Sequence, residues 1–448
     1  MRKQTGGHFY INILNFNDVV EAEEQTQKEL KHSIHALDTF FSSIETYGKK
    51  YYANEFVVEK VTGSRLHMYV QTEDIQNAFS IIADISAYAF SLTDFMSSEI
   101  AKYKTLLKFS IQIGADFGRF YEFEFHSEEI EEMTTIGYPA NFAAKLQNLA
   151  AKSQLNISEI MFDSLPLRQK NLFIKKNSEQ IKKYEQKCYY TTNLSALTMR
   201  RNIATDLENA KDFAKRVNLT EMRASEVRKL VNFENITKKE YKKVQGIPLY
   251  ADVRDFTRQF NADGSNLEEM TERTANILKS MYTVVKKRSG VHIQFQGDRE
   301  QALFHDYGSY SCTKDAVIAG LEIIDAIKDQ GVTVGVGQAI GTVYVTKIGA
   351  RGEKDNLLLG KTVNEADSNE DEKAGKNQLV ISKEIYDILR KSNPILANLF
   401  RVYDATSYYT EKGYREYLSS CEYRQQRIAN SSNSYNGAWG SYDAESVQ

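Results

Sequence analysis

The chain repeats one order of elements twice, and this internal repeat constrains its fold more than any other feature. In each copy, apolar periodicity predicts a buried strand, a long helical stretch, a strand pair closed by a glycine turn, and a second helix. The predicted elements fall at 8–16, 20–50, 56–70 and 73–95 in the first copy, and at 247–256, 266–287, 290–304 and 314–330 in the second. A colinear repeat of this kind predicts two domains with one α+β fold.

The repeat continues through the second half of each copy. The segments FSIQIGADFGRFYEFEF (109–125) and VTVGVGQAIGTVYVTKI (332–348) both predict a strand, a Gly-x-x-x-Gly turn and another strand. Residues 135–165 then align with residues 358–389. The two copies have therefore diverged without losing their order.

The domain boundaries follow from where the repeat stops. We expect one domain at 1–195 and a second at 246–424, joined by a charged connector of helical period at 196–245. Residues 425–448 are rich in Ser, Asn and Gly, which predicts a disordered tail. A chain of 448 residues is also too long for one ordinary core.

Charge, cysteine content and hydropathy exclude several classes of protein. The formal net charge of −3 gives no support to nucleic-acid binding. Cys188, Cys312 and Cys421 lie far apart without the spacing of a zinc site, which fits a reducing compartment. The sequence has neither the apolar run of a signal peptide nor a segment of about 18 apolar residues. We therefore expect a cytoplasmic protein without membrane insertion.

The two copies differ at the turn of the strand pair. The first copy has Gly63 followed by Ser64, whereas the second has Gly297 followed by Asp298. An aspartate after a glycine is usually only a turn-forming residue. Asp298 therefore indicates chemistry only when it is taken together with other motifs.

A set of ordered motifs gives the copies a family resemblance. The second copy carries, in order, YADVRDFT, QGDREQALF, GVGQAIGTVYVTKIG and LLGKTVNEADS. This set resembles that of the class III nucleotidyl cyclases, the family of adenylate and guanylate cyclases. The first copy is similar to the family more loosely, through EKVTGSRLHMY, GADFGRF and TIGYPANFAAKL. The resemblance implies two ferredoxin-like α+β domains packed head to tail, as an intramolecular pseudo-heterodimer whose active site is shared across the seam.

The resemblance also implies that the metal ions bind to the second domain only. Asp252 and Asp298 match the two metal-binding aspartates of the family, and the first domain has Asn12 and Ser64 at those positions. Two Mg²⁺ or Mn²⁺ ions suit such an oxygen-ligand site. In the implied reaction, the ribose 3′-hydroxyl attacks the α-phosphate of a nucleoside triphosphate and diphosphate leaves. Metals held by paired carboxylates activate the hydroxyl and neutralise the leaving group.

The first domain carries the complementary residues. Asn141 matches the family's asparagine, and Lys145 stands where the family has arginine, whereas the second domain has Asn364 and Ser368 there. The implied roles are that Asn141 orients the ribose and that Lys145 stabilises charge on the α-phosphate. Lysine keeps the positive charge of arginine but loses its planar fork. A helix cap for Asn141 and a solvated lysine for Lys145 are the alternative interpretations.

The resemblance implies that Lys60, four residues before Ser64, and Thr134, three residues before Gly137, are the base-reading residues of the first domain. A lysine only donates hydrogen bonds and a threonine hydroxyl can accept one, a pair that suits cytosine or adenine better than uracil or guanine. The divergent motifs resemble the pyrimidine cyclases of bacterial anti-phage (Pycsar) defence, which favours CTP as the substrate and cyclic CMP as the product. UTP and ATP remain alternatives, as do an ordinary solvated lysine for Lys60 and a simple strand residue for Thr134.

Two classes of function stay open at this point. The first is an active cyclase with a nucleoside triphosphate as substrate, a phage-derived trigger and a separate effector that reads the cyclic nucleotide. The second is a non-catalytic sensor that keeps the fold and binds a nucleotide or a partner protein. We expect the histidines to form no close metal-like cluster and to take no part in chemistry; they stand at 8, 32, 35, 67, 126, 292 and 305.

Overall fold

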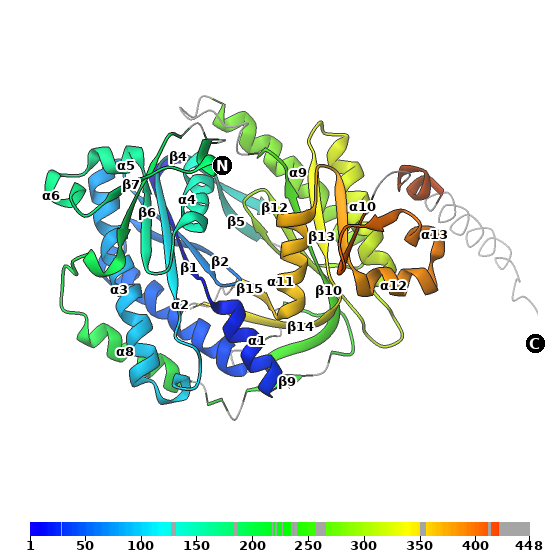
Figure 1. The fold of residues 1–448 in the computed structure, drawn as a ribbon, viewed down its shortest axis with the longest axis horizontal. Coiled ribbons are helices and arrows are strands. Elements are labelled where there is room, and N and C mark those ends of the chain that lie inside the picture. The colour runs from blue at the N-terminus through cyan, green and yellow to red at the C-terminus, as the bar shows by residue number, and fades with distance from the viewer. Residues whose placement is uncertain are drawn as a thin grey trace, which may run out of the picture.

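The structure is a computed structural model that describes most of the chain (Figure 1). The residues outside the description are 28, 127–130, 183, 185, 217, 220–221, 226, 234–235, 237–239, 257–265, 350–354, 411–413 and 421–448. The expected tail at 425–448 and Cys421 therefore lie outside the described residues.

The first domain has a central sheet with helices packed on it. Its elements are β1 (Arg2–Ile13), α1 (Phe16–Gln27), α2 (Lys31–Tyr52), β2 (Phe56–Thr62), β3 (Arg65–Gln71), α3 (Ile75–Glu99), β4 (Ile111–His126), β5 (Glu131–Ile136), α4 (Tyr138–Leu149), β6 (Gln154–Ser158), α5 (Glu159–Ser164), α6 (Leu167–Lys170), β7 (Ile174–Lys176), α7 (Glu179–Lys182) and β8 (Tyr189–Asn193). The strand order is β2-β3-β1-β4-β6-β8-β7, and β5 pairs with β4. The part from β1 to β4 is the βαββαβ unit of a ferredoxin-like fold.

The second domain repeats this order. Its elements are β10 (Glu240–Val253), α9 (Leu267–Lys287), β11 (Val291–Gln296), β12 (Arg299–His305), α10 (Thr313–Lys328), β13 (Val334–Gln338), β14 (Gly341–Ile348), β15 (Asp355–Leu359), α11 (Lys361–Ser368), β16 (Gln378–Ser382), α12 (Lys383–Ser392), α13 (Pro394–Ala397), β17 (Phe400–Val402) and β18 (Ser407–Thr410). The strand order is β11-β12-β10-β13-β16-β18-β17, with β14 paired to β10 and to β15. The predicted tandem α+β architecture is therefore confirmed.

The connector between the domains contains α8 (Ala204–Lys215) and the short strand β9 (Arg223–Ser225). α8 is fixed to α2, because Asp206 accepts hydrogen bonds from Lys50 Nζ at 2.7 Å and from the Tyr51 hydroxyl at 2.9 Å. β9 pairs in parallel with the start of β10. The connector thus packs onto both domains.

Two sequence predictions about elements of the first domain are wrong. The helical stretch at 20–50 is divided into α1 and α2, because Glu23 on α1 accepts from the backbone N–H groups of His32 and Ser33 and so caps the start of α2. The strand, turn and strand expected at 109–125 form one continuous strand, β4. β4 stays unbroken because it pairs with all of β1, whereas the equivalent partner of β10 is divided into β13 and β14.

In each domain, two strands extend to the other domain and pack into its core (Figure 1). Phe123, Phe125 and Ile136, from β4 and β5, belong to the core of the second domain. The core of the first domain includes Tyr344, Ile348, Leu357 and Leu359, from β14 and β15. We call β4–β5 and β14–β15 the exchanged arms.

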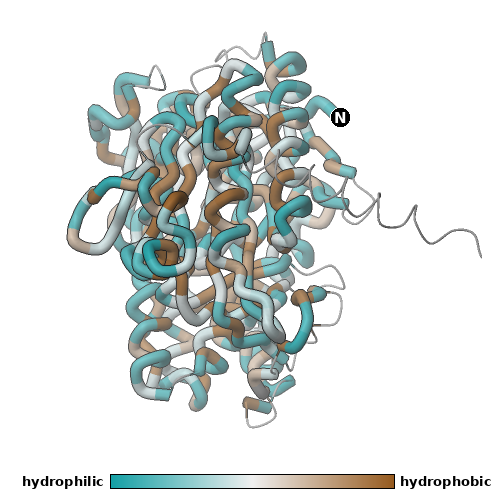
Figure 2. Tube along the Cα trace, turned by 90° about the vertical axis from the view of Figure 1, so that its right-hand side faces the viewer, coloured by the Kyte–Doolittle hydropathy of each residue, from teal (hydrophilic) through white to brown (hydrophobic). Residues whose placement is uncertain are grey.

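Hydrophobic and hydrophilic stretches alternate along the helices (Figure 2), as expected for elements that cover a core. α3 is long and apolar enough to cross a membrane by composition, but 67% of its apolar window is buried. Ile82, Ile85 and Ala89 on α3 have no exposed surface. This burial is typical of a core helix, and no other described helix meets the same test.

Candidate active site

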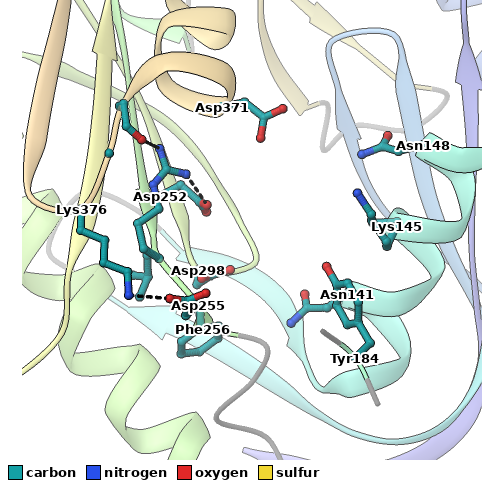
Figure 3. Close-up of a pocket in the computed structure, with 15 residues that line it drawn as sticks. Asn141, Lys145, Asn148, Tyr184, Asp252, Asp255, Phe256, Asp298, Asp371 and Lys376 are labelled. Carbon is teal, nitrogen blue, oxygen red and sulfur yellow. Dashed lines mark hydrogen bonds and ion pairs between the residues drawn. The ribbon is translucent and has the colours of Figure 1, made fainter. Parts of the chain in front are cut away.

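A pocket of about 460 Å³ lies between the domains and brings together four of the predicted site residues (Figure 3). Asn141 and Lys145 come from α4 of the first domain, and Asp252 and Asp298 come from the second. The other lining residues are Ala144, Asn148, Tyr184, Val253, Arg254, Asp255, Phe256, Asp371, Ala374, Gly375 and Lys376. The expected sharing of one site between two halves of the chain is therefore present in the geometry.

Neighbouring strands place the two aspartates. Asp252 lies near the end of β10, where it pairs in register with Arg299, the first residue of β12. Asp298 directly precedes Arg299, in the turn between β11 and β12. Gly297 has φ +68° in the turn between β11 and β12, a conformation that glycine adopts at little cost. The turn therefore presents Asp298 beside Asp252.

A close approach of α4 to the sheet places the residues of the opposite wall. A side chain at Gly114 on β4 would meet the backbone nitrogen of Gln147 at 2.0 Å, so glycine allows the helix to lie directly on the strand. Asn141 lies inside α4 rather than at its cap, because the helix begins after Gly137. The side chain of Asn141 points into the pocket, with Oδ1 3.8 Å from where a Cβ on Gly297 would lie. The alternative role as a helix cap is therefore excluded.

The two carboxylates have an unfavourable electrostatic environment. Burial raises the pKa of Asp252 above its ordinary value, although Arg299 and Arg254 oppose the shift. Burial, followed by the charge of Asp252, raises the pKa of Asp298 well above its ordinary value. Adjacent oxygen ligands of this kind fit a hard divalent cation such as Mg²⁺ or Mn²⁺. Asp252 and Asp298 could therefore serve as ligands of such an ion, and Asp255 and Asp371 are the other carboxylates that line the pocket.

Arg254 is a pocket residue that sequence reasoning missed. Its guanidinium lies 3.5 Å from Asp252 Oδ2 and 2.7 Å from Glu370 Oε1, and it donates to the carbonyl of Ala374 at 2.9 Å. Arg254 therefore ties the end of β10 to the wide helical turn Asn369–Lys373 after α11. The signal was its position two residues after Asp252, since such residues share a face of an extended chain.

Lys60 and Thr134 do not line this pocket. Lys60 is buried and donates to Glu132 and to the carbonyl oxygen of Phe295. Thr134 is fully buried and donates to Glu59 at 3.3 Å. The structure therefore places both predicted base-reading residues in the seam between the domains, with their polar groups engaged.

Equivalent carboxylates fasten the two exchanged arms to the opposite domain. Glu132 on β5 accepts from the backbone N–H of Phe295 at 2.8 Å, and Asp355 on β15 accepts from that of Val61 at 2.7 Å. Glu132 also pairs with Lys60 and His292, which hold its pKa below the ordinary value despite burial. Burial raises the pKa of Asp355 to about 7.

The mirror position of the repeat holds a second cavity, of about 240 Å³. Asn12, Ser64 and Asn364 line it, as the sequence alignment of the copies predicts. Arg65 and Arg299 also line it. The absence of a lysine or arginine at Ser368 therefore does not leave the mirror pocket without positive charge.

The expectation that the histidines form no close cluster is wrong. His8 Nδ1 lies 3.0 Å from His67 Nε2, and His67 Nδ1 lies 2.9 Å from Glu59 Oε2. The three residues could hold a metal ion by distance, and they are far apart in sequence but adjacent in the sheet because β1 and β2 both flank β3. His67 uses both ring nitrogens within this chain of contacts, which is how a buried hydrogen-bonded network is satisfied.

Comparison with solved structures supports the fold. The chain is similar to a class III adenylyl cyclase-like ATP-binding protein from Pseudomonas aeruginosa, with 17% identity over 86% of this chain and 85% of that one, and a TM-score of 0.64. The adenylyl cyclase CyaB from P. aeruginosa matches 39% of this chain with 97% of its own length, at 21% identity and a TM-score of 0.33. The guanylate cyclase domain of RhGC from Catenaria anguillulae, in complex with GTP, is similar over 38% of this chain and 98% of its own length, at 17% identity and a TM-score of 0.32.

Sequence comparisons add nothing further, because no family model and no curated protein matches the chain. The first structural match covers most of both chains, so the tandem arrangement is shared as a whole. The chain therefore has a class III cyclase-like fold in a tandem arrangement.

Proposed function

We propose that the protein is a nucleotidyl cyclase that converts a nucleoside triphosphate to a 3′,5′-cyclic nucleotide and diphosphate. One observation carries the proposal: Asp252 and Asp298 of one domain face Asn141 and Lys145 of the other across a single pocket. The equivalent mirror pocket has Asn12 and Ser64 in place of the carboxylates. One chain would then hold one working site.

The roles of the residues follow from their chemistry. Asp252 and Asp298 would hold two Mg²⁺ or Mn²⁺ ions, which would lower the pKa of the ribose 3′-hydroxyl and neutralise the charge of the leaving diphosphate. Asn141 hydrogen-bonds the ribose and keeps the 3′-hydroxyl aligned with the α-phosphate. Lys145, on the wall opposite the carboxylates, stabilises the negative charge that grows on the α-phosphate.

We propose CTP as the favoured substrate, with UTP and ATP as the alternatives. The structure supplies one supporting contact: the Thr134 hydroxyl donates to Glu59, so its remaining lone pairs suit the exocyclic amine of cytosine or adenine. Lys60 already donates hydrogen bonds to Glu132 and to the Phe295 carbonyl oxygen. To contact the base, Lys60 must give up one of these two hydrogen bonds. A second-messenger role in anti-phage defence, in the cytoplasm, completes the proposal.

A non-catalytic nucleotide-binding protein is the second candidate. Its support is the similarity over 86% of the chain to a cyclase-like protein described as ATP-binding. The contact of Arg254 with Asp252 also fits such a protein, because a guanidinium beside the carboxylate competes with a metal ion.

Product formation separates the two candidates. The purified protein is incubated with Mn²⁺ and each of the four nucleoside triphosphates, and cyclic products are detected by mass spectrometry. The matched controls are the Asp252→Asn/Asp298→Asn pair and the Asn12→Ala/Ser64→Ala pair from equivalent positions. Product from the wild type and the second pair, but not from the first, supports the cyclase. Nucleotide binding without any cyclic product would favour the second candidate.

A further inference from the structure

Lys376 is a pocket residue to which the sequence resemblance assigns no role. It lies in the loop before β16 and lines the pocket beside Gly375 and Ala374. Figure 3 shows Lys376 on the wall opposite Lys145, with Asp252 and Asp298 between the two lysines. The pocket therefore offers one ammonium group on each side of the carboxylates.

The ammonium group of Lys376 is held by an aspartate of the same wall. Its Nζ lies 2.7 Å from Asp255 Oδ2, and the side chains are 65% and 40% exposed. Asp255 has φ +59°, a left-handed conformation that is uncommon for residues other than glycine and asparagine. An ion pair with this much exposure contributes little to stability, so a stronger anion can displace Asp255.

The backbone around Lys376 is fixed on both sides. Arg254 donates to the carbonyl of Ala374 at 2.9 Å, and the Gly375 N–H donates to Gln378 Oε1 at 2.9 Å. Asn377 donates its N–H to the carbonyl of Val334 at 2.8 Å. The loop therefore presents the lysine from a rigid base, which lowers the entropic cost of binding an anion.

We propose that Lys376 binds the terminal phosphates of the nucleoside triphosphate and that Asp255 competes with them for the same ammonium group. The proposal rests on the proposed function, since it assigns the phosphate end of the same pocket. When the triphosphate binds, Lys376 Nζ gives up its contact with Asp255 and contacts a phosphate oxygen instead. Asp255 thus weakens binding of triphosphates and of inorganic phosphate chains.

The two members of the pair should have opposite effects on binding. Removing the ammonium with Lys376→Ala or Lys376→Gln should weaken binding of Mg²⁺-tripolyphosphate by about five- to tenfold. Asp255→Asn should tighten it by roughly two- to fivefold, because the competing charge is lost while asparagine tolerates the left-handed backbone. In the double variant the gain from Asp255→Asn should disappear.

Calorimetric titration of the full chain with tripolyphosphate in Mg²⁺ measures these changes without any need for turnover. The matched controls are Lys383→Ala and Asp387→Asn, an exposed pair on α12 with a 2.6 Å contact outside the pocket. These controls should bind as the wild type does. The opposite signs for Asp255→Asn and Lys376→Ala would support the exchange.

The outcomes also separate this inference from the proposed function. If the wild type makes a cyclic nucleotide but Lys376→Ala and Lys376→Gln bind tripolyphosphate normally, the role of Lys376 is refuted and the cyclase stands. If the wild type binds neither tripolyphosphate nor any nucleoside triphosphate, both fail. Equal changes in the α12 controls would assign the effect to general surface charge and refute the exchange.

Discussion

The pocket at Asp252 and the mirror pocket stand at equivalent positions of the repeat and differ in how their polar groups are satisfied. In the mirror pocket, the Ser64 hydroxyl donates to Asn12 Oδ1 at 2.7 Å. The equivalent pair in the first pocket, Asp298 and Asp252, has no such option, because two ionised carboxylates only accept. The Asn12–Ser64 pair satisfies itself with a hydrogen bond, whereas the Asp252–Asp298 pair needs neighbouring positive charge, part of which Arg254 supplies. Under the proposed function, this difference is the reason that the chain keeps the same element twice and uses only one copy.

The largest expected effect tests the carboxylate pair. Asp252→Asn or Asp298→Asn should lower turnover by about a thousandfold or more, because each ligand is needed to hold the metal ions. The matched changes Asn12→Ala and Ser64→Ala should leave turnover within a few fold. Cyclic product is measured by mass spectrometry, and the fold is checked by circular dichroism. Near-normal turnover with either aspartate replaced would show that the pair does not bind the catalytic metals.

The second prediction compares the asparagines of the two pockets. Asn141→Ala and Lys145→Ala should each lower kcat by a factor on the order of 100, if each stabilises the transition state. Asn364→Ala should change kcat only a few fold. Steady-state kinetics with the preferred triphosphate provides the measurement. Equal losses from Asn141→Ala and Asn364→Ala would break the comparison, since both pockets would then be in use.

The third prediction concerns the base. CTP should be turned over roughly ten- to a hundredfold better than UTP, because uracil presents a ring N–H to Lys60 and a carbonyl to the Thr134 oxygen. Lys60→Ala should reduce this ratio, whereas Gln294→Ala, at the equivalent position of the second domain, should preserve it. Competition assays with equimolar triphosphates give the ratios directly. Dominant cyclic UMP or cyclic GMP would contradict the donor argument, and dominant cyclic AMP would contradict only the preference for CTP.

The smallest expected effects compare two ionisable residues that line the same cavity in the seam, His292 and Asp355. His292 has its pKa raised to about 9 by Glu300 and Glu132, which outweigh burial. The stabilisation from His292 is therefore complete below its unfolded pKa of about 6.5 and is lost as pH rises through 9. His292→Gln should lower the Tm by about 2–4 °C at pH 6, and the difference should vanish near pH 10.

Replacing Asp355 should raise the Tm, whereas replacing His292 lowers it. Its folded pKa of about 7 lies above the unfolded value, so ionisation destabilises the folded protein as pH rises from about 4 to 7. Asp355→Asn keeps an acceptor for the Val61 N–H and should raise the Tm above that of the wild type at pH 8 but not at pH 4. Thermal unfolding across this range measures both variants. A Tm difference independent of pH would remove ionisation as the cause.

Particular residues show how far the sequence predicts this molecule. The repeat predicted the tandem α+β fold, and the resemblance to class III cyclases implied which side chains of the other domain would meet Asp252. It could not predict that Lys60 would be held by Glu132, since that contact joins β2 to an arm whose path depends on the opposite domain. The pairing of Arg254 with Glu370 likewise spans 116 residues and depends on how α11 ends. Local patterns predict elements and faces, whereas contacts between distant elements depend on the packed whole.

Because of the exchanged arms, the core of the first domain can be completed only after part of the second domain has been synthesised. When the first domain leaves the ribosome, its core still lacks Tyr344, Ile348, Leu357 and Leu359, which are synthesised later. At about 5–20 residues per second, the wait lasts on the order of ten seconds or more. During that interval Phe123 and Phe125 have no second domain to enter. The apolar surface that these residues cover in the finished protein therefore stays exposed on the nascent first half until β14 and β15 have been made.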